Sequence, residues 1–556
     1  MRSTAGMLCL AAALATGDPA RAQVTPKEVT AQEVTGSAGV EGAFVDTLDV
    51  QAVNVEVVVT DRKGDRVPDL TAADFRLLID GKPVPLDYFA EIREGRPVVA
   101  PGTEESDLPP ALTDLEADEE VGTSYLVFID ELHSPPNLRN EAFKVLARDL
   151  HLLGTRDRMA VVAFDSKRLR ILTDWTTPGP ALEETLRKAS TRKGYLQVGD
   201  FDIASDLKPW KLTGETLGAD NSLQPSEYEA SAMKNVLARD VVLAAAGALR
   251  TFDPPSGRKV ALIFSGGWML QAKTPDMDMA GMQETFRVRD SFPALRPLTD
   301  AANLLGYTVY PIQLADMPLP GAGDRDQGNT TMFTTMGRGA INYVMRQSGL
   351  VFSAEETGGR FLKAGASHLQ RIAEDTRSYY WLGFTSTAAD NKRRNLEVQV
   401  LRDGLKVRSR SSFLPLSRSV RSAMMVEGAL LTGRAMPNAK PMEVLTGPAE
   451  EKGPHTAQLP LTFRIPVEAI TLLPQDGRLI AHLQLWIASI DKQGRRSEVT
   501  VTPISFAVAE MPGPGKRVVY RSDIMVRKAE QEVQLALIDA QSGETLSARI
   551  KLDLDR

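Results

Sequence analysis

The sequence predicts an α/β protein, built on a doubly wound, mainly parallel sheet and flanked by small all-β sandwich domains. Two patterns carry this prediction. Between about residues 124 and 384, short apolar runs alternate with stretches of helical spacing, which is typical of β-α units that form a parallel sheet with helices on both faces. On either side of that region, apolar and polar residues alternate with a period of two, as in half-buried strands.

The composition is that of an ordinary globular protein. At one domain per ~150 residues, the 556 residues suggest about three to four domains. Hydrophobic residues make up 43% and charged residues 25%, which argues against a largely disordered or fibrous chain. The 65 Lys and Arg against 72 Asp and Glu leave a net charge of −7. We therefore expect no nucleic-acid partner.

The first 22 residues are predicted to be a secretory signal peptide (1–22). An apolar stretch follows Arg2, and Ala20-Arg21-Ala22 supplies the small-x-small pattern that a signal peptidase requires. The apolar stretch is far shorter than the ~20 residues of a membrane span, and no later segment reaches 18 apolar residues. We expect cleavage before Gln23 and a mature protein in the periplasm or outside the cell, with no membrane span. The only cysteine, Cys9, would leave with the signal.

Residues 45–93 are predicted to form an N-terminal β-sandwich-like module. Valines alternate with other residues from Val53 to Val59, and turn signals follow at 61–64 and at Asp80-Gly81. Residues 94–122 are rich in proline and acidic side chains. We interpret them as a solvated linker.

Residues 123–414 are predicted to form the α/β domain. Helical spacing follows Ser134 and recurs around 226–248 and 283–304, and a β-hairpin over 394–413 is appended to the domain. Five apolar runs are predicted as core strands, of which the first ends at Asp130: Tyr125–Ile129, Met159–Phe164, Lys259–Phe264, Tyr307–Ile312 and Ser378–Phe384.

Residues 415–458, rich in Pro, Gly and Met, are predicted to be a second linker. Alternating strands over 459–556 predict a C-terminal β-sandwich. We expect proteolysis to cut first in the two linkers, and the fragment 124–413 to stay folded by itself.

The motifs of this region resemble an exported family, the VWFA-related Acidobacterial domain proteins, and more broadly the von Willebrand factor type A fold. The family has no assigned chemistry, so the resemblance bears on the fold more than on function. It covers roughly residues 50–413. The motifs that carry it are Val57–Gly64, Asp69–Phe75, Asp80-Gly81, Asp157–Phe164, Gly257–Gly267, Glu356–Gly359 and Ser378–Phe384.

The resemblance implies a metal-ion-dependent adhesion site at the ends of the strands. Its first motif, Asp-x-Ser-x-Ser, keeps Asp130 and Ser134 here, but Leu132 stands in place of the middle Ser. Gly266 stands in place of the Asp of the third motif, and Thr191 is one candidate for the Thr of the second. Mg²⁺ prefers oxygen ligands in octahedral geometry. We therefore expect a degenerate site, no cofactor, and at most weak Mg²⁺ binding at Asp130 and Ser134.

Simpler roles are open for the same residues. Ser134 would serve as the N-cap of the following helix, before Pro135 and Pro136. Asp130 would accept hydrogen bonds from loop amides near that helix N-terminus. His133 is interpreted as a loop histidine rather than a ligand, although Glu131 could supply a substitute oxygen.

Catalytic motifs are weak. Ser265-Gly266-Gly267 follows a predicted core strand, but Gly-x-Ser-x-Gly is absent, as are the glycine-rich phosphate-binding motifs. Tyr379, Tyr380 and Trp381 are expected to pack within a sheet, with a ligand platform as the alternative.

The sequence therefore predicts an exported, non-catalytic binding protein. Its partners would be proteins of the envelope or outside the cell, held by the loops near Asp130. Two alternatives are kept: an extracytoplasmic serine hydrolase using Ser265, and a purely structural envelope component.

Overall fold

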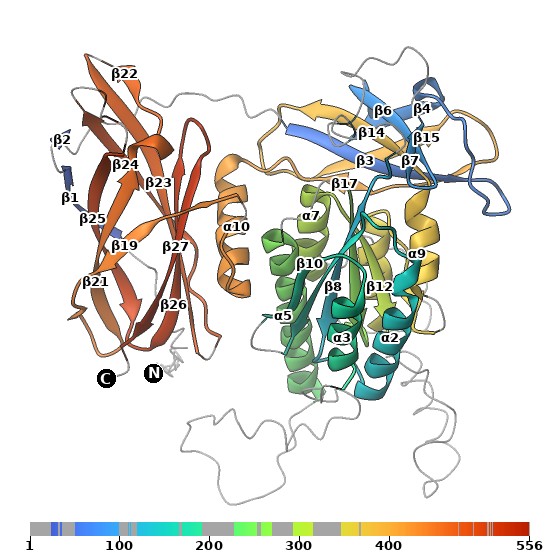
Figure 1. The fold of residues 1–556 in the computed structure, drawn as a ribbon, viewed down its shortest axis with the longest axis horizontal. Coiled ribbons are helices and arrows are strands. Elements are labelled where there is room, and N and C mark those ends of the chain that lie inside the picture. The colour runs from blue at the N-terminus through green and yellow to red at the C-terminus, as the bar shows by residue number, and fades with distance from the viewer. Residues whose placement is uncertain are drawn as a thin grey trace, which may run out of the picture. The chain divides into compact units, whose positions relative to one another are not determined.

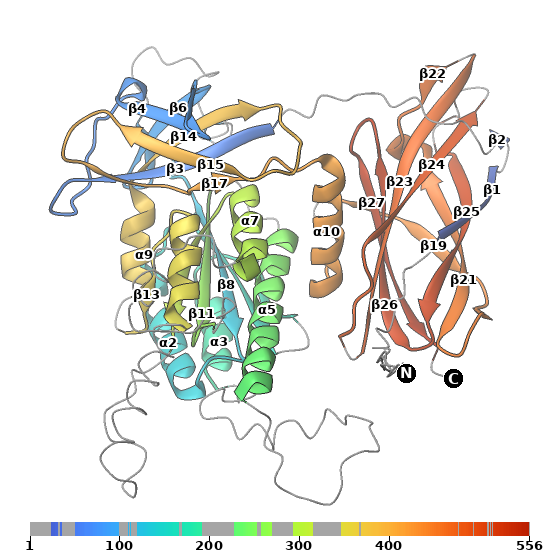
Figure 2. The same cartoon turned by 180° about the vertical axis from the view of Figure 1, so that it is seen from behind.

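The computed structural model groups the chain into two units, Val45–Pro437 and a second unit of Met1–Phe44 with Asn438–Arg556 (Figures 1 and 2). Both the predicted signal peptide and most of the predicted linker 94–122 lie outside the residues that the structure describes. The described residues are 24–31, 34–35, 51–98, 109, 112, 119–165, 169–191, 227–252, 257–268, 293–314, 346–365, 368–436, 438–475, 477–492, 494–508, 511, 513 and 515–554.

A six-stranded, mainly parallel sheet forms the centre of the first unit, in the order β10-β9-β8-β11-β12-β13. Its strands are β8 (Thr123–Asp130), β9 (Arg158–Phe164), β10 (Leu169–Thr176), β11 (Arg258–Ser265), β12 (Tyr307–Gln313) and β13 (Leu362–Lys363). Only β10 pairs antiparallel, in a hairpin with β9. The doubly wound, mainly parallel sheet predicted from the apolar runs is confirmed.

Helices cover both faces of this sheet (Figure 1). They are α2 (Pro136–Arg148), α3 (Pro180–Ala189), α5 (Glu227–Thr251), α7 (Arg296–Leu305) and α9 (His368–Arg377). Side chains of β8 alternate between the faces: Leu126 and Phe128 pack with α5 and α7, whereas Val127 and Ile129 pack with α2, α3 and α9. Burial on both faces explains why the strand is a continuous apolar run.

Two further sheets, in which every described pair is antiparallel, pack against each other in the same unit, in the orders β16-β3-β14-β6-β7 and β17-β15-β4-β5. Their strands are β3 (Gln51–Thr60), β4 (Phe75–Ile79), β5 (Lys82–Val84), β6 (Tyr88–Arg93), β7 (Arg96–Val98), β14 (Tyr379–Ser386), β15 (Arg394–Val400), β16 (Lys406–Arg408) and β17 (Ser412–Phe413). Each of the two sheets combines strands from both ends of the unit (Figure 1).

This pairing corrects two predictions. Strand β14 is not a strand of the parallel sheet, because it pairs antiparallel with β3 and β6. The predicted module over 45–93 is not self-contained, because residues 379–413 supply its remaining strands. The reason is physical: Tyr380 and Leu382 face one core and Tyr379 and Trp381 another, so β14 has the all-apolar pattern of a parallel strand.

The predicted linker 415–458 contains regular structure, so that prediction is wrong. Helix α10 (Arg418–Thr432) begins where the Ser417 hydroxyl accepts a hydrogen bond from the Val420 amide, and Gly433 ends it in the left-handed conformation, with φ of 74°. A Cβ on Gly247 of α5 would lie 2.8 Å from Leu431 of α10. Glycines in these two helices thus allow close packing rather than linker flexibility. Short strands follow: β18 (Lys440–Pro441), β19 (Glu443–Thr446) and β20 (Glu450–Glu451).

The second unit consists of two mostly antiparallel sheets around one apolar core. Its longer strands are β21 (Thr456–Pro466), β23 (Arg478–Asp491), β24 (Thr500–Val508), β25 (Arg517–Arg527), β26 (Glu530–Asp539) and β27 (Thr545–Asp553), with the short β22 (Leu473–Gln475). Strand β1 (Val24–Ala31) pairs antiparallel with β25, and β2 (Val34–Thr35) pairs with β1. No sequence pattern indicated this pairing between the two ends of the chain.

None of the helices in the described part of the chain is both long enough and apolar enough to cross a bilayer.

Candidate functional site

The carboxyl ends of β8 and β11 mark the switch point of the parallel sheet. The two strands are neighbours, but the chain continues from β8 toward β9 on one side and from β11 toward β12 on the other. Ligands of open α/β sheets bind in the crevice at such a point. Asp130 is the last residue of β8 and Ser265 the last of β11, so both lie where a site is expected.

The carboxylate of Asp130 is fully buried and already bonded within the protein. Its Oδ1 accepts hydrogen bonds from the amides of Leu132 (3.1 Å) and His133 (3.0 Å). Its Oδ2 accepts from the Ser265 hydroxyl (2.7 Å) and the Trp268 indole (3.1 Å), and lies 2.9 Å from Nδ1 of His133. A carboxylate offers about four acceptor sites, so these five contacts saturate it.

This environment keeps Asp130 ionised. Burial by itself would raise the pKa of the carboxyl, but the attraction of His133 and the hydrogen bonds from His133 and Ser265 outweigh burial and hold the pKa below its ordinary value. The charge of the carboxylate is therefore balanced by internal donors.

The structure corrects the N-cap interpretation of Ser134. Helix α2 has Pro135 at its N-cap position and no side-chain capping bond, because the helix begins one residue later than the motif suggested. The buried Ser134 hydroxyl instead donates to the Phe264 carbonyl on β11, at the long distance of 3.5 Å. Ser134 thus links the two strand ends.

The departures from the adhesion-site motif have structural reasons. Leu132 is 1% exposed and belongs to the core on the α5 side of the sheet. A Cβ on Gly266 would lie 1.9 Å from the His133 carbonyl oxygen, so an acidic side chain does not fit at position 266. Trp268, which is fully buried, directs its indole N–H to Asp130. The two loops therefore close on each other over the carboxylate.

The donor set does not fit Mg²⁺. That ion needs oxygen ligands and usually keeps several waters, whereas Oδ2 of Asp130 faces an indole, a hydroxyl and an imidazole. Thr191, just after α3, donates its hydroxyl to the Lys188 carbonyl at 2.9 Å. Within the described ranges, no group of three or more His, Cys, Asp or Glu is arranged to hold a metal ion.

The arrangement also gives little support to Ser265 as a nucleophile. Its side chain is fully buried, its hydroxyl donates to Asp130, and its oxygen accepts the Gly267 amide at 3.0 Å. An activated serine needs a base in hydrogen-bond contact. The only side-chain base that Ser265 is seen to contact in the described structure is Asp130, whose carboxylate already accepts from other donors, and His133 contacts that carboxylate rather than the serine.

Sequence reasoning located Asp130, Ser134 and Ser265 at one edge, and the structure brings Asp130 and Ser265 into contact. It missed the role of Trp268. The available signal was an indole three residues beyond a strand end, in a loop whose two glycines allow a close approach.

The fold and this edge define a class: a doubly wound α/β domain with a closed switch point, joined to antiparallel sheets. No protein-family model and no curated protein matches the chain. A von Willebrand factor type A protein from Catenulispora acidiphila is 10% identical over 78% of this chain and 66% of its own, with a TM-score of 0.19. The pilus adhesin SpaC from Lactobacillus rhamnosus GG is 8% identical over 78% and 57%, with a TM-score of 0.24.

A third solved structure, the PilB minor pilin from Streptococcus sanguinis, is 9% identical over 48% of this chain and 62% of its own, with a TM-score of 0.23. The chain spans less than two thirds of the length of each of these three structures. The structural similarity to von Willebrand factor type A domains is distant. At such TM-scores it carries no argument about function, and the description of the fold rests on the strand order above.

Proposed function

We propose that this chain is an exported, non-catalytic binding protein that holds a protein partner at the carboxyl edge of its parallel sheet without a metal ion. The observation that supports this most directly is the saturated carboxylate of Asp130, whose Oδ2 accepts from Ser265 and Trp268. A metal-dependent site would need that oxygen for the ion.

The position of the strand ends favours this edge as the contact surface. Strands β8 and β11 end side by side at the switch point of the sheet, where ligands of open α/β sheets bind. Binding residues are concentrated on loops that a rigid scaffold positions.

Membership of the VWFA-related Acidobacterial family is part of the proposal. It is supported by the series of sequence motifs between Val57 and Phe384, in family order. Export is supported by the signal pattern of residues 1–22. N-terminal mass spectrometry of protein recovered outside the cytoplasm should find Gln23 first, and an intact Met1 would contradict export with cleavage.

Crosslinked affinity capture from native envelope tests the binding role. Wild-type bait should retain a discrete partner equally well in Mg²⁺ and in EDTA. A bait in which residues 269–292 are replaced by a short Gly/Ser linker should lose it. The matched control replaces residues 192–226 in the same way, in a connection that follows helix α3 rather than a core strand.

Three results would contradict the proposal: capture that requires Mg²⁺, capture that survives both loop replacements, or no partner under any condition. The last result would favour the alternative of a structural envelope component. Labelling by a fluorophosphonate probe that is lost in Ser265→Ala would favour the hydrolase.

A further inference from the structure

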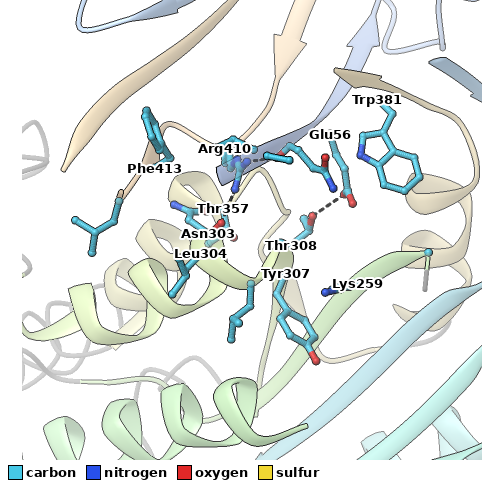
Figure 3. A pocket seen from close by; sticks show the side chains of 17 residues that line it. Glu56, Lys259, Asn303, Leu304, Tyr307, Thr308, Thr357, Trp381, Arg410 and Phe413 are labelled. Carbon is cyan, nitrogen blue, oxygen red and sulfur yellow. Dashed lines mark hydrogen bonds between the residues drawn. The ribbon is translucent and has the colours of Figure 1, made fainter. Parts of the chain in front are cut away.

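A cavity of about 220 Å³ lies within the first unit, at the edge of the parallel sheet opposite Asp130 (Figure 3). Its upper side comes from β3 and β14, where Glu56 pairs in register with Trp381. Its lower side comes from the starts of β11 and β12, where Lys259 and Tyr307 are paired with each other. The cavity therefore separates the antiparallel sheets from the parallel sheet.

The turn between α7 and β12 shapes the lower side. Helix α7 ends at Leu305, and Gly306 takes the left-handed conformation, with φ of 75°. The chain then enters β12 at once, so Asn303 and Thr308 both line the cavity from the two sides of this turn. On β3, the alternate residues Asn54 and Glu56 line it from above, while Val55 and Val57 point into the sandwich core.

Arg410 is the most unusual residue of the cavity. Its side chain is buried, and its two terminal nitrogens donate to the backbone carbonyls of Asn303 and Asn54. Its Nε is buried without a hydrogen-bond partner in the described structure. Burial lowers the pKa of the guanidinium to about 10, so it is still protonated at neutral pH. A buried charge normally has a charged partner.

The acid that lines the cavity, Glu56, is shared by other groups. Its Oε2 lies 3.1 Å from Nε of Arg258 and accepts the Thr308 hydroxyl at 3.0 Å. The guanidinium groups of Arg258 and Arg410 thus share the carboxylate of Glu56, and the Lys259 side chain also lines the cavity. An anion would be attracted here.

Two further polar atoms of residues that line the cavity lack partners in the described structure. The Nδ2 group of Asn303 donates to the Glu356 carbonyl and the Ser412 hydroxyl, but its Oδ1 is buried and unpaired. The indole nitrogen of Trp381 is likewise buried and unpaired. Native proteins leave few buried polar atoms unsatisfied, and a site for a bound ligand or water is a common reason. Here a donor, an acceptor and a charge line the same cavity.

We propose that this cavity binds a small organic carboxylate that also carries a hydroxyl or amino group. The carboxylate pairs with the Arg410 guanidinium through the unpaired Nε and accepts the indole N–H of Trp381. The hydroxyl or amino group donates to Oδ1 of Asn303. The volume, which is below the usual range of about 300–1,000 Å³ for drug-sized ligands, limits the ligand to a small solute. This inference is independent of the protein-binding role proposed above.

Calorimetric titration and thermal melting of the full mature chain test the proposal. The probes are lactate, glycine, acetate, inorganic phosphate and methyl lactate, each against chloride at equal ionic strength. Lactate or glycine should bind saturably and raise the melting temperature. Acetate, which lacks the second group, should bind more weakly, and the uncharged methyl lactate should not bind.

Three variants test whether the carboxylate binds in this cavity. Trp381→Phe keeps the ring and removes the N–H, and should weaken binding by about 2- to 10-fold, the worth of one net hydrogen bond. Asn54→Trp places a large side chain at the exposed rim of the cavity and should abolish binding. Asn395→Trp, the same exchange at an exposed position of β15 that does not line the cavity, should bind as wild type.

Arg410→Gln should also lose binding, but it removes two contacts that hold the layers together, so the two variants above decide the matter if it fails to fold. The proposal is overturned if no probe carboxylate binds saturably, if Asn54→Trp binds as well as Asn395→Trp, or if phosphate alone binds.

Discussion

The two edges of the parallel sheet differ in how their buried charges are satisfied. At the carboxyl edge, the Asp130 carboxylate has five internal donors from two loops. At the amino edge, the Arg410 guanidinium has two carbonyl partners and an unpaired Nε. General experience with α/β folds places ligands at the carboxyl edge. In this protein the carboxyl edge, where a ligand would be expected, is closed. The buried polar groups without partners lie at the amino edge instead.

The two edges differ because the loops at the carboxyl edge come into close backbone contact. Gly266 lets the loop after β11 meet the loop after β8, and this contact leaves Asp130 no room for an ion. At the opposite edge, the sheet of β3 and β14 covers the strands without filling the space between them. A sequence motif therefore marks where a site can form, whereas the hydrogen bonds of its buried polar groups show whether those groups are free to bind a ligand.

The largest expected effect concerns the antiparallel sheets that pack over the amino edge. The fragment 124–413, expected from sequence to fold alone, lacks β3 and β6, the two strands that flank β14. It should be aggregated or molten, because unpaired strand edges and an open core are exposed. The fragment 45–437 should be folded and monodisperse by near-ultraviolet circular dichroism and gel filtration. A well-folded 124–413 would show that the amino edge is not built as described.

The next effect concerns the closed edge. Asp130→Ala leaves the Ser265 hydroxyl and the Trp268 indole buried without an acceptor, and should lower the free energy of unfolding by about 3–5 kcal/mol in urea titration. The control is Asp174→Ala, which removes a half-exposed carboxylate paired with Arg434. It should cost less than about 1 kcal/mol. Equal losses of stability in the two variants would mean that the hydrogen-bond network at Asp130 does not stabilise the protein.

A smaller effect tests whether close contact between the loops after β8 and β11 closes the carboxyl edge. Gly266→Asp restores the acid of the metal-site motif, but its Cβ would meet the His133 carbonyl. We expect a loss of about 2–3 kcal/mol and no gain in Mg²⁺ affinity. Gly179→Asp is the matched control, because nothing lies within 4 Å of its Cβ and Asp is favourable at the N-cap of α3. A stable Gly266→Asp variant that binds Mg²⁺ would break the explanation.

The pH dependence of stability tests the amino edge, where Asp375 of α9 connects the parallel sheet to the antiparallel sheets. Burial alone would raise its pKa, but Arg408, Tyr310 and Arg66 outweigh burial and lower it to about 2. The unfolded state takes up the proton first, so the stability is full above about pH 5 and falls as the pH drops toward 2.

Asp375→Asn should therefore lose about 2 kcal/mol at pH 7 and little near pH 2, as measured by urea unfolding across this range. Asp390→Asn, which removes a surface carboxylate paired with Arg394, should show a much flatter difference. A loss at Asp375 that does not change with pH would contradict the ionic role.

The parallel sheet could be predicted because strands such as β8 are apolar along their whole length and lie in chain order. The position of β14 could not, since its paired residues lie 380 − 57 = 323 positions away in β3 and 379 − 92 = 287 positions away in β6, and local patterns carry no pairing information. The composition of helix α10 concealed it from sequence analysis. Its Gly428 counted as a linker signal, but a Cβ there would lie 2.8 Å from Arg250 of α5, so this glycine serves close helix packing. Asp130 could be located from its motif. The hydrogen bond from Trp268 that completes its set of donors depends on loop geometry, and so does the position of Arg410 beside a cavity.

Metal titration of the full mature chain tests the central claim, that the carboxyl edge is closed and works without a metal. Melting temperatures in EDTA and in 1–10 mM Mg²⁺ or Mn²⁺, roughly the millimolar range at which weak sites fill, should agree within about one degree. For scale, a ligand at 100 times its Kd stabilises by about 2.7 kcal/mol, an easily measured shift. A saturable rise in the melting temperature that disappears in Asp130→Asn would contradict the claim and make Asp130 a metal ligand.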